Sequence, residues 1–138
     1  HPANYSYLSV ATPSSHDTST IRGWWEEDYS QSQRFYYEIL GNHGPAPVFC
    51  STDVVKQIII QHLYSPSMWA IFPIQDLFGM DEQLRYPNPH AERINNPGNS
   101  NHYWRYRLHI SIEKLIEQST FNSYLKELIQ ASGRYDVY

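Results

Sequence analysis

A histidine and an aspartate stand side by side at His16–Asp17, within the stretch PSSHDTST. Asp17 is a candidate catalytic carboxylate, because carboxylates serve as acids, bases and stabilisers of developing charge. The alternative is an aspartate that caps a helix or stabilises a turn, since Asp is common in both roles. Small hydroxyl side chains surround the pair, and two tryptophans, Trp24–Trp25, follow it. Which of the two roles Asp17 has depends on the strands and helices that flank this stretch.

Two more stretches carry polar groups with chemical potential. Gln75 and Asp76 directly follow the apolar run SPSMWAIFPI, and their alternative role is again that of a helix cap. The stretch Ile94–Ile110 is dense in amides, with Trp104 and two arginines among them. These side chains can hydrogen-bond to and stack on a polyhydroxylated ligand. Equally, they can build a structured loop whose arginines pair with acidic residues.

Motif spacing argues against several other kinds of site. The seven histidines are widely scattered, and neither an HExxH motif nor paired Cys/His spacing is present, so we expect no metal site. The surroundings of Cys50 do not indicate a nucleophile. GNHGPAP lacks the Gly-Lys-Ser/Thr ending of a phosphate-binding loop, and no GxSxG motif occurs. We therefore expect neither a metal nor a cofactor.

The composition is that of a globular chain of one modest domain. Of its 138 residues, 41% are hydrophobic and 17% charged, which excludes a disordered protein. The formal charge is -4, and no basic stripe is present, so nucleic acid is not expected as a partner. No apolar run approaches the ~20 residues that span a bilayer, and we expect no membrane association. A single cysteine favours a reducing compartment, which predicts a cytoplasmic protein.

Apolar patterning predicts strands that alternate with helices. Runs rich in β-branched and aromatic residues predict short strands at Tyr5–Ala11 and Ser65–Ile74, the second of them buried on both faces. Between them, a helical pattern in one or two pieces covers Ile21–Gly41, with N-cap candidates at Thr18–Thr20. A further helix is expected to begin at Ser51–Asp53.

The second half of the chain continues this pattern. One helical turn ends at Gly79, and a long loop broken by prolines follows over Asp81–Arg107. Two helices close the chain. The last of them carries its apolar residues on one face: Phe121, Tyr124, Leu125, Leu128 and Ile129.

This order of elements favours an α/β fold with a parallel sheet. In such folds the loops beyond the carboxyl ends of the strands hold the active site. We therefore expect His16–Asp17 and Gln75–Asp76 to lie at the same rim.

Three stretches together resemble a known family. SSHDTSTIRGWWEED, SPSMWAIFPIQDLFGMDEQLR and ERINNPGNSNHYWRYRL are similar, in order and spacing, to the C-terminal catalytic part of the 4-α-glucanotransferases, the amylomaltases or disproportionating enzymes. The plant cytosolic type and its bacterial relatives resemble the chain most, from about Leu8 to Leu125. The resemblance implies the C-terminal part of a (β/α)₈ TIM barrel, with parallel strands Tyr7–Ala11 and Met68–Phe72 and flanking helices.

The resemblance also implies an activity. The family transfers α-1,4-glucan segments between maltooligosaccharides, or to glucose or polysaccharide acceptors, by a retaining double displacement in starch, glycogen and maltose metabolism. Asp17 corresponds to a carboxylate that stabilises the distorted sugar in the transition state, and His16 to the substrate-binding histidine beside it. Asn95 corresponds to an asparagine that contacts substrate. Gln75 and Asp76 fall in a motif where sugar contact and a structural role are equal alternatives.

The nucleophile and the acid/base of this family lie on earlier strands, which find no match in residues 1–138. A complete barrel needs roughly 250 residues. Because the sequence begins at His1 rather than Met, we expect these residues to be a C-terminal portion of a longer chain, inactive alone, whose partners are an α-glucan and the remainder of the same barrel. The expected role of Trp24–Trp25 is to pack the following helix. The alternative function is a non-catalytic carbohydrate-binding or interaction module.

Overall fold

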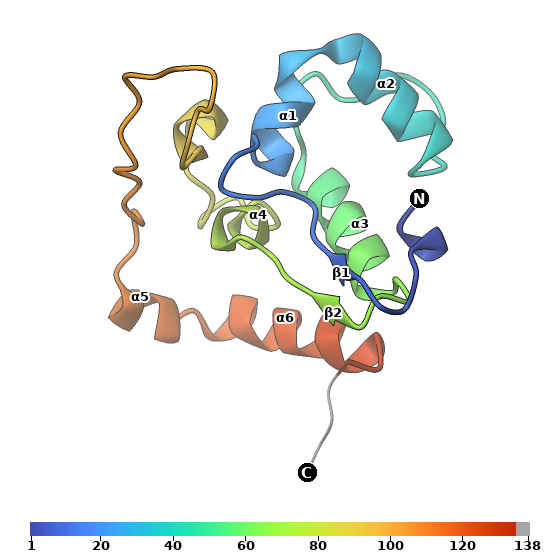
Figure 1. Cartoon of the computed structure of the whole chain (residues 1–138). Helices are drawn as coiled ribbons and strands as arrows, with labels where there is room; N and C mark the ends of the chain where they lie inside the picture. Colours follow the sequence, from blue (N-terminus) through green and yellow to red (C-terminus); the bar gives the residue numbers. More distant parts are fainter. Residues whose placement is uncertain (135–138) are drawn as a thin grey trace.

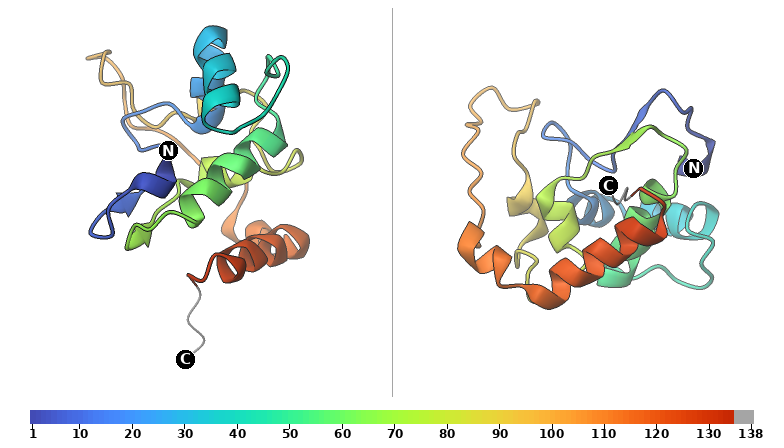
Figure 2. Two further views of the ribbon diagram at one scale, coloured as in Figure 1. Left: turned by 90° about the vertical axis from the view of Figure 1, so that its right-hand side faces the viewer. Right: turned by 90° about the horizontal axis from the view of Figure 1, so that it is seen from below.

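A pair of short parallel strands lies between helices in the computed structural model, which describes residues 1–134 (Figure 1). Helix α3 runs beside the strands, α1 and α2 lie on one side of them, and α6 lies along the other (Figures 1 and 2). The elements, in chain order, are η1 (Pro2–Asn4), β1 (Val10–Ala11), α1 (Ile21–Glu27), α2 (Tyr29–Glu38), α3 (Thr52–Leu63), β2 (Trp69–Ala70), α4 (Ile74–Phe78), η2 (Pro89–Glu92), α5 (Ile112–Ile116) and α6 (Ser119–Ala131).

The two strands pair in parallel, as the order of elements predicts. Val10 lies opposite Trp69, and Ala11 lies opposite Ala70. The pairing continues beyond the assigned strands, because the amide of Ile71 donates to the carbonyl of Ala11 at 2.9 Å. An α/β fold with two parallel strands and flanking helices is thereby confirmed. The regular strands are shorter than the apolar runs that predict them.

The second strand is not buried on both faces, and that prediction is wrong for this chain. Trp69 is 62% exposed and Ile71 56%, and Val10 on the neighbouring strand is 46% exposed. A strand is covered on both faces only where a layer of other elements packs on each side. Within residues 1–134 the face of the pair that carries Ala11 packs against the helices, whereas the opposite face, which carries Val10, Trp69 and Ile71, is exposed.

Helix ends follow the cap signals of the sequence. The hydroxyl of Thr20 accepts from the amide of Gly23 and begins α1, and Ser51 does the same for Val54 at the start of α3. The helical pattern over Ile21–Gly41 divides at Asp28, whose carboxylate accepts from the first amides of α2. Hydrogen bonds from the side chains of Ser30 and Gln31, together with these amides, lower the pKa of Asp28 to about 2. Helix α2 ends at Glu38, before the glycine expected to end it.

The core forms where α1, α3, α4 and α6 meet. Trp25, Val55, Ile59 and Phe78 have almost no exposed surface. Helix α6 adds the buried Phe121, and the other predicted members of its apolar face are partly buried against the same core. Trp24 and Trp25 contact Phe35 and Tyr36 edge-to-face, with ring centroids 5.2 and 6.2 Å apart, so they pack α2 as predicted.

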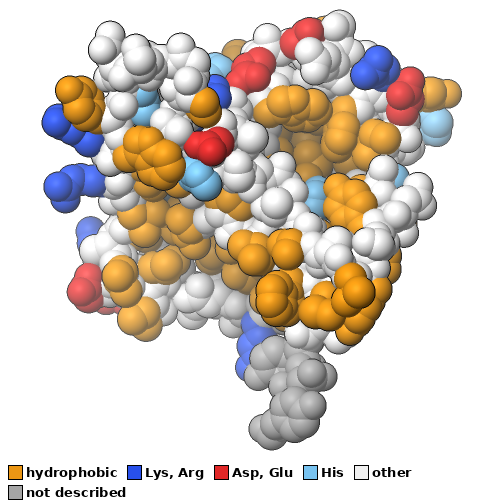
Figure 3. Space-filling view, in the orientation of Figure 1, with side chains coloured by type: hydrophobic (Ala, Val, Ile, Leu, Met, Phe, Trp, Pro, Cys, Tyr) orange, Lys and Arg blue, Asp and Glu red, His pale blue; other side chains and the backbone are white. Residues whose placement is uncertain are grey.

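Hydrophobic side chains also spread widely over the surface (Figure 3). Several belong to the strands and the residues beside them: Tyr7, Leu8, Val10, Met68, Trp69 and Ile71. Contiguous apolar surface beside strand edges promotes association with other chains.

We therefore expect a polypeptide of these 138 residues to associate or aggregate when purified alone, because its strand pair lacks a covering layer. Size-exclusion chromatography with light scattering checks this. A monomer with a sharp thermal transition, raised in temperature by maltotetraose, would contradict it and would favour a self-standing carbohydrate-binding module.

Candidate functional site

The loop between β1 and α1 holds the His16–Asp17 pair. Its two ends are buried at Ser14 and Thr20, whereas the residues between them reach the surface. Inside the loop, side-chain hydroxyl groups accept hydrogen bonds from backbone amides. The amide of Ser15 donates to the hydroxyl of Thr18 at 2.9 Å, and the amide of Asp17 donates to the hydroxyl of Ser15 at 3.3 Å. Small hydroxyl residues thus form a tight turn that presents the pair at the surface.

Asp17 lies between an imidazole and an amide. His16 Nε2 is 3.3 Å from Asp17 Oδ2, and both side chains are about half exposed, at 54% and 51%. The other carboxylate oxygen, Oδ1, accepts from Asn95 Nδ2 at 2.7 Å. The backbone amide of Asn95 also donates to the carbonyl of His16 at 3.1 Å. The structure therefore joins three of the sequence-predicted site residues, although 78 positions separate Asp17 from Asn95.

A second anchor fixes the loop of Asn95. Arg93 Nε donates to the carbonyl of Asn95 at 2.8 Å, and Arg93 Nη1 donates to the hydroxyl of Ser19 at 3.1 Å. Arg93 therefore bridges the two loops that form the site. The sequence analysis did not identify Arg93 as a site residue. The signal that could have identified it was its place two positions before Asn95.

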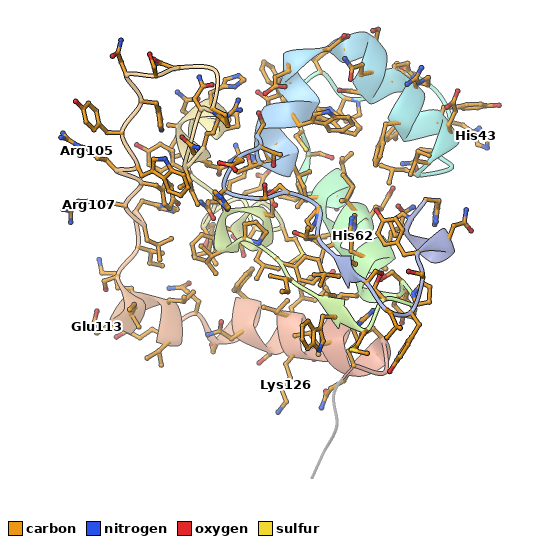
Figure 4. The ribbon with its side chains drawn as sticks, in the orientation of Figure 1. His43, His62, Arg105, Arg107, Glu113 and Lys126 are labelled. Atoms are coloured by element: carbon orange, nitrogen blue, oxygen red, sulfur yellow. The ribbon has the colours of Figure 1, made fainter. Side chains whose placement is uncertain are left out.

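Trp104 contributes an aromatic face to the same site. Its ring lies 5.1 Å from the imidazole of His16, centroid to centroid, and the side chain is largely exposed. Such a face can stack on a sugar ring. Arg105 and Arg107 extend away from the site (Figure 4), and Arg105 lies over the ring of Tyr103 at 4.9 Å.

Gln75 and Asp76 lie beneath the loop rather than beside its exposed pair. Asp76 is 1% exposed, and its Oδ1 accepts from the backbone amide of Ile21 at 2.8 Å. Its Oδ2 accepts from the hydroxyl of Ser14. Gln75 Nε2 donates to the carbonyl of Glu92 at 3.3 Å. Both residues thus lie at the same end of the strands as His16–Asp17, in an arrangement that favours the structural alternative for them.

Burial decides the electrostatics of Asp76. Removal of its carboxyl group from water raises its pKa to about 6, and the hydrogen bonds from Ser14 and Ile21 oppose this rise. A buried carboxylate is unfavourable unless donors compensate it. The donors of Asp76 come from the two ends of the loop that carries Asp17.

A buried ion pair adjoins this carboxylate. Arg22 Nη1 lies 2.6 Å from Glu92 Oε1, and the two side chains are 6% and 1% exposed. Thr20 Oγ1 donates to Glu92 Oε2 at 3.2 Å, and Arg22 also donates to the carbonyl of Tyr86 at 2.8 Å. Burial raises the pKa of Glu92, and the charge of Arg22 opposes that effect. Sequence reasoning missed this pair, although an arginine beside Ile21 on a core-packing helix was a usable signal.

A cavity of about 710 Å³ opens beside the loop, between α1, α2 and α3. Asp17, Thr18 and Arg93 lie at its polar end, whereas Trp24 and Phe35 line its apolar part. His62, on α3 (Figure 4), lines the same cavity, and burial lowers the pKa of its imidazole. The cavity therefore combines polar side chains of the loop, together with Glu27 and His62, with an aromatic wall.

Two further features of residues 1–134 bear on the kind of site. No group of three or more His, Cys, Asp or Glu side chains is arranged there to hold a metal ion. No helix in that range has the length and apolar character needed to cross a membrane. Cys50 is buried, which raises the pKa of its thiol to about 12.

Comparisons with known proteins agree with one another. The sequence pattern of the 4-alpha-glucanotransferase family matches residues 1–113. The chain is 43% identical over 133 residues to 4-alpha-glucanotransferase DPE2 of Oryza sativa subsp. japonica, covering 96% of this chain and 14% of the relative. It is 37% identical over 125 residues to the 4-alpha-glucanotransferase of Chlamydia muridarum, covering 90% of this chain and 23% of the relative.

A solved structure shows the same fold. The amylomaltase from Streptococcus agalactiae in complex with acarbose superposes with a TM-score of 0.71 at 21% identity, covering 98% of this chain and 24% of that one. The chain thus spans less than a quarter of the length of these relatives. The family pattern includes every residue of the His16–Asp17–Asn95 cluster. The chain belongs to the 4-alpha-glucanotransferase family.

Proposed function

We propose that the chain is part of an enzyme that transfers α-1,4-glucan segments between maltooligosaccharides, or to glucose or polysaccharide acceptors, with retention of configuration. The observation that carries this proposal is the contact of Asp17 with both His16 and Asn95, within the region that the family pattern matches. His16 and Asp17 are half exposed, and Asp17 lies at the edge of the cavity, where a sugar can reach it.

Asp17 acts on the sugar through hydrogen bonds, without forming a covalent bond to it. The transition state of glycoside transfer is a flattened, oxocarbenium-like ring, and hydrogen bonds to its hydroxyl groups strengthen as positive charge develops. The carboxylate of Asp17 can accept hydrogen bonds from these hydroxyl groups. The imidazole of His16 and the amide of Asn95 can bind neighbouring hydroxyl groups. Because these bonds tighten only in the transition state, they accelerate the reaction instead of merely tightening substrate binding.

The two other carboxyl groups that a retaining mechanism needs come from outside residues 1–138. We infer that these residues are a C-terminal portion of a (β/α)₈ barrel, and that the rest of the same barrel covers their exposed strand pair. The match to under a quarter of an amylomaltase chain supports this inference. The single, free cysteine Cys50 fits a reducing compartment, and we propose that the enzyme is cytoplasmic.

Incubation of the intact enzyme with maltotriose tests the proposal. We expect glucose together with longer maltooligosaccharides, because a transferase passes the bound segment to another sugar. Chromatography of the products distinguishes this from simple hydrolysis. Absence of any product longer than maltotriose would overturn the proposed function.

A further inference from the structure

One buried carboxylate holds both ends of the loop that carries Asp17. Ser14 lies at the start of the loop, and its hydroxyl donates to Asp76 Oδ2. Ile21 follows the end of the loop, and its amide donates to Asp76 Oδ1 at 2.8 Å. Each oxygen of Asp76 is therefore bound to one end of the same loop.

Asp17 itself has no comparable anchor. Its side-chain partners, His16 and Asn95, both lie on surface loops, and the carboxylate is half exposed. The hydroxyl contacts inside the turn fix its shape and not its place on the fold. The loop is attached to the core at its buried ends, Ser14 and Thr20–Ile21, while Asn95 and Arg93 join it to a second surface loop.

Helix α4 gives Asp76 a firm base. Phe78 on this helix is 1% exposed, and Gly79 at its end approaches α3 so closely that a Cβ there would lie 3.1 Å from a methyl carbon of Val55. Contacts this close leave the helix little room to shift. The position of Asp76 is thus set by the core, and its hydrogen bonds transmit that position to the loop.

We propose that Asp76 is a positioning residue for glucan transfer. By binding Ser14 and the amide of Ile21, it holds the loop so that Asp17 lies where it can contact the reacting sugar. The inference rests on the proposed function. A direct contact of Asp76 with sugar is disfavoured, because its side chain is buried and both of its oxygens are already bound.

Two matched serine substitutions separate positioning from stability. Ser14→Ala removes a buried hydroxyl that binds Asp76, and Ser32→Ala removes a buried hydroxyl that binds the carbonyl of Trp25 on α1. We expect both variants of the intact enzyme to lower the Tm to a similar degree. Only Ser14→Ala should reduce kcat for maltotriose, by up to about a hundredfold, since small displacements of a catalytic group have effects of this size. KM should change much less than kcat, because Asp17 acts in the transition state.

A third variant tests the carboxylate directly. Asp76→Asn keeps one acceptor oxygen for the amide of Ile21, so we expect this variant to fold. Its loss of activity should be smaller than that of the double variant Ser14→Ala/Asp76→Leu, in which both hydrogen bonds to the loop are absent. Wild-type kcat in both Ser14→Ala and Asp76→Asn, with Asp17→Asn inactive, would overturn the positioning role alone. Full activity of Asp17→Asn would overturn the proposed function and the inference together.

Discussion

Asp17→Asn in the intact enzyme should reduce glucan transfer by about a thousandfold or more. Each 1.36 kcal/mol of lost transition-state stabilisation lowers the rate about tenfold, so the loss of about 4 kcal/mol from a group aimed at developing charge corresponds to about a thousandfold. The asparagine keeps the shape of the side chain and an oxygen that accepts from Asn95, so the loop should stay in place. The initial rate of glucose release from maltotriose measures the effect.

Controls make this result specific to Asp17. Asp53→Asn removes a carboxylate that is 83% exposed and forms only a surface pair with Lys56, so its rate should match the wild type. His16→Ala should have a milder effect than Asp17→Asn, because it removes a neutral group rather than a charge. Unchanged melting of Asp17→Asn confirms an intact fold. Near wild-type transfer by this variant would exclude an essential role for the carboxylate.

The second large effect is expected from the buried ion pair. Glu92→Gln leaves the Arg22 guanidinium buried without a countercharge, and we expect it to lower the free energy of unfolding by about 3–5 kcal/mol. The double variant Arg22→Met/Glu92→Leu should recover much of that loss, since neither charge then remains in the core. Urea unfolding of the intact enzyme measures both.

An exposed pair serves as the comparison. Arg34 and Glu38 lie 3.9 Å apart on α2, with side chains 74% and 57% exposed. Glu38→Gln should change the free energy of unfolding by less than about 0.5 kcal/mol, because water already screens the pair. Equal effects of Glu92→Gln and Glu38→Gln would mean that the Arg22–Glu92 contact does not contribute through burial.

Local signals in the sequence predicted the elements well. Ser51 and Thr20 cap α3 and α1, as expected from hydroxyl residues before apolar periods. The burial of the second strand was predicted wrongly, because an apolar run reports what a strand needs and not whether the neighbouring layers are present. Strand length was overestimated for a related reason, since regular strand pairing covers only two residues of each run within the described part of the chain.

The sequence predicted which residues form the site, but not the buried contacts that hold them in place. The resemblance named His16, Asp17 and Asn95, and the structure brings these three together. Asp76 was open between two roles, which only its burial and its two hydrogen bonds could separate. The position of Arg22 on a core-packing helix signals its burial, but nothing in the local sequence identifies Glu92, 70 positions away, as its partner.

That separation has a consequence for biosynthesis. A ribosome adds about 5–20 residues per second, so Arg22 emerges roughly 4–14 s before Glu92, which follows it by 70 positions. During this interval the nascent helix α1 can cap itself through Thr20, but its guanidinium cannot enter a core without being left unpaired. Docking of α1 is therefore delayed until the η2 segment is synthesised, and the loop of Asp17 takes its final place only as the loop of Asn95 arrives.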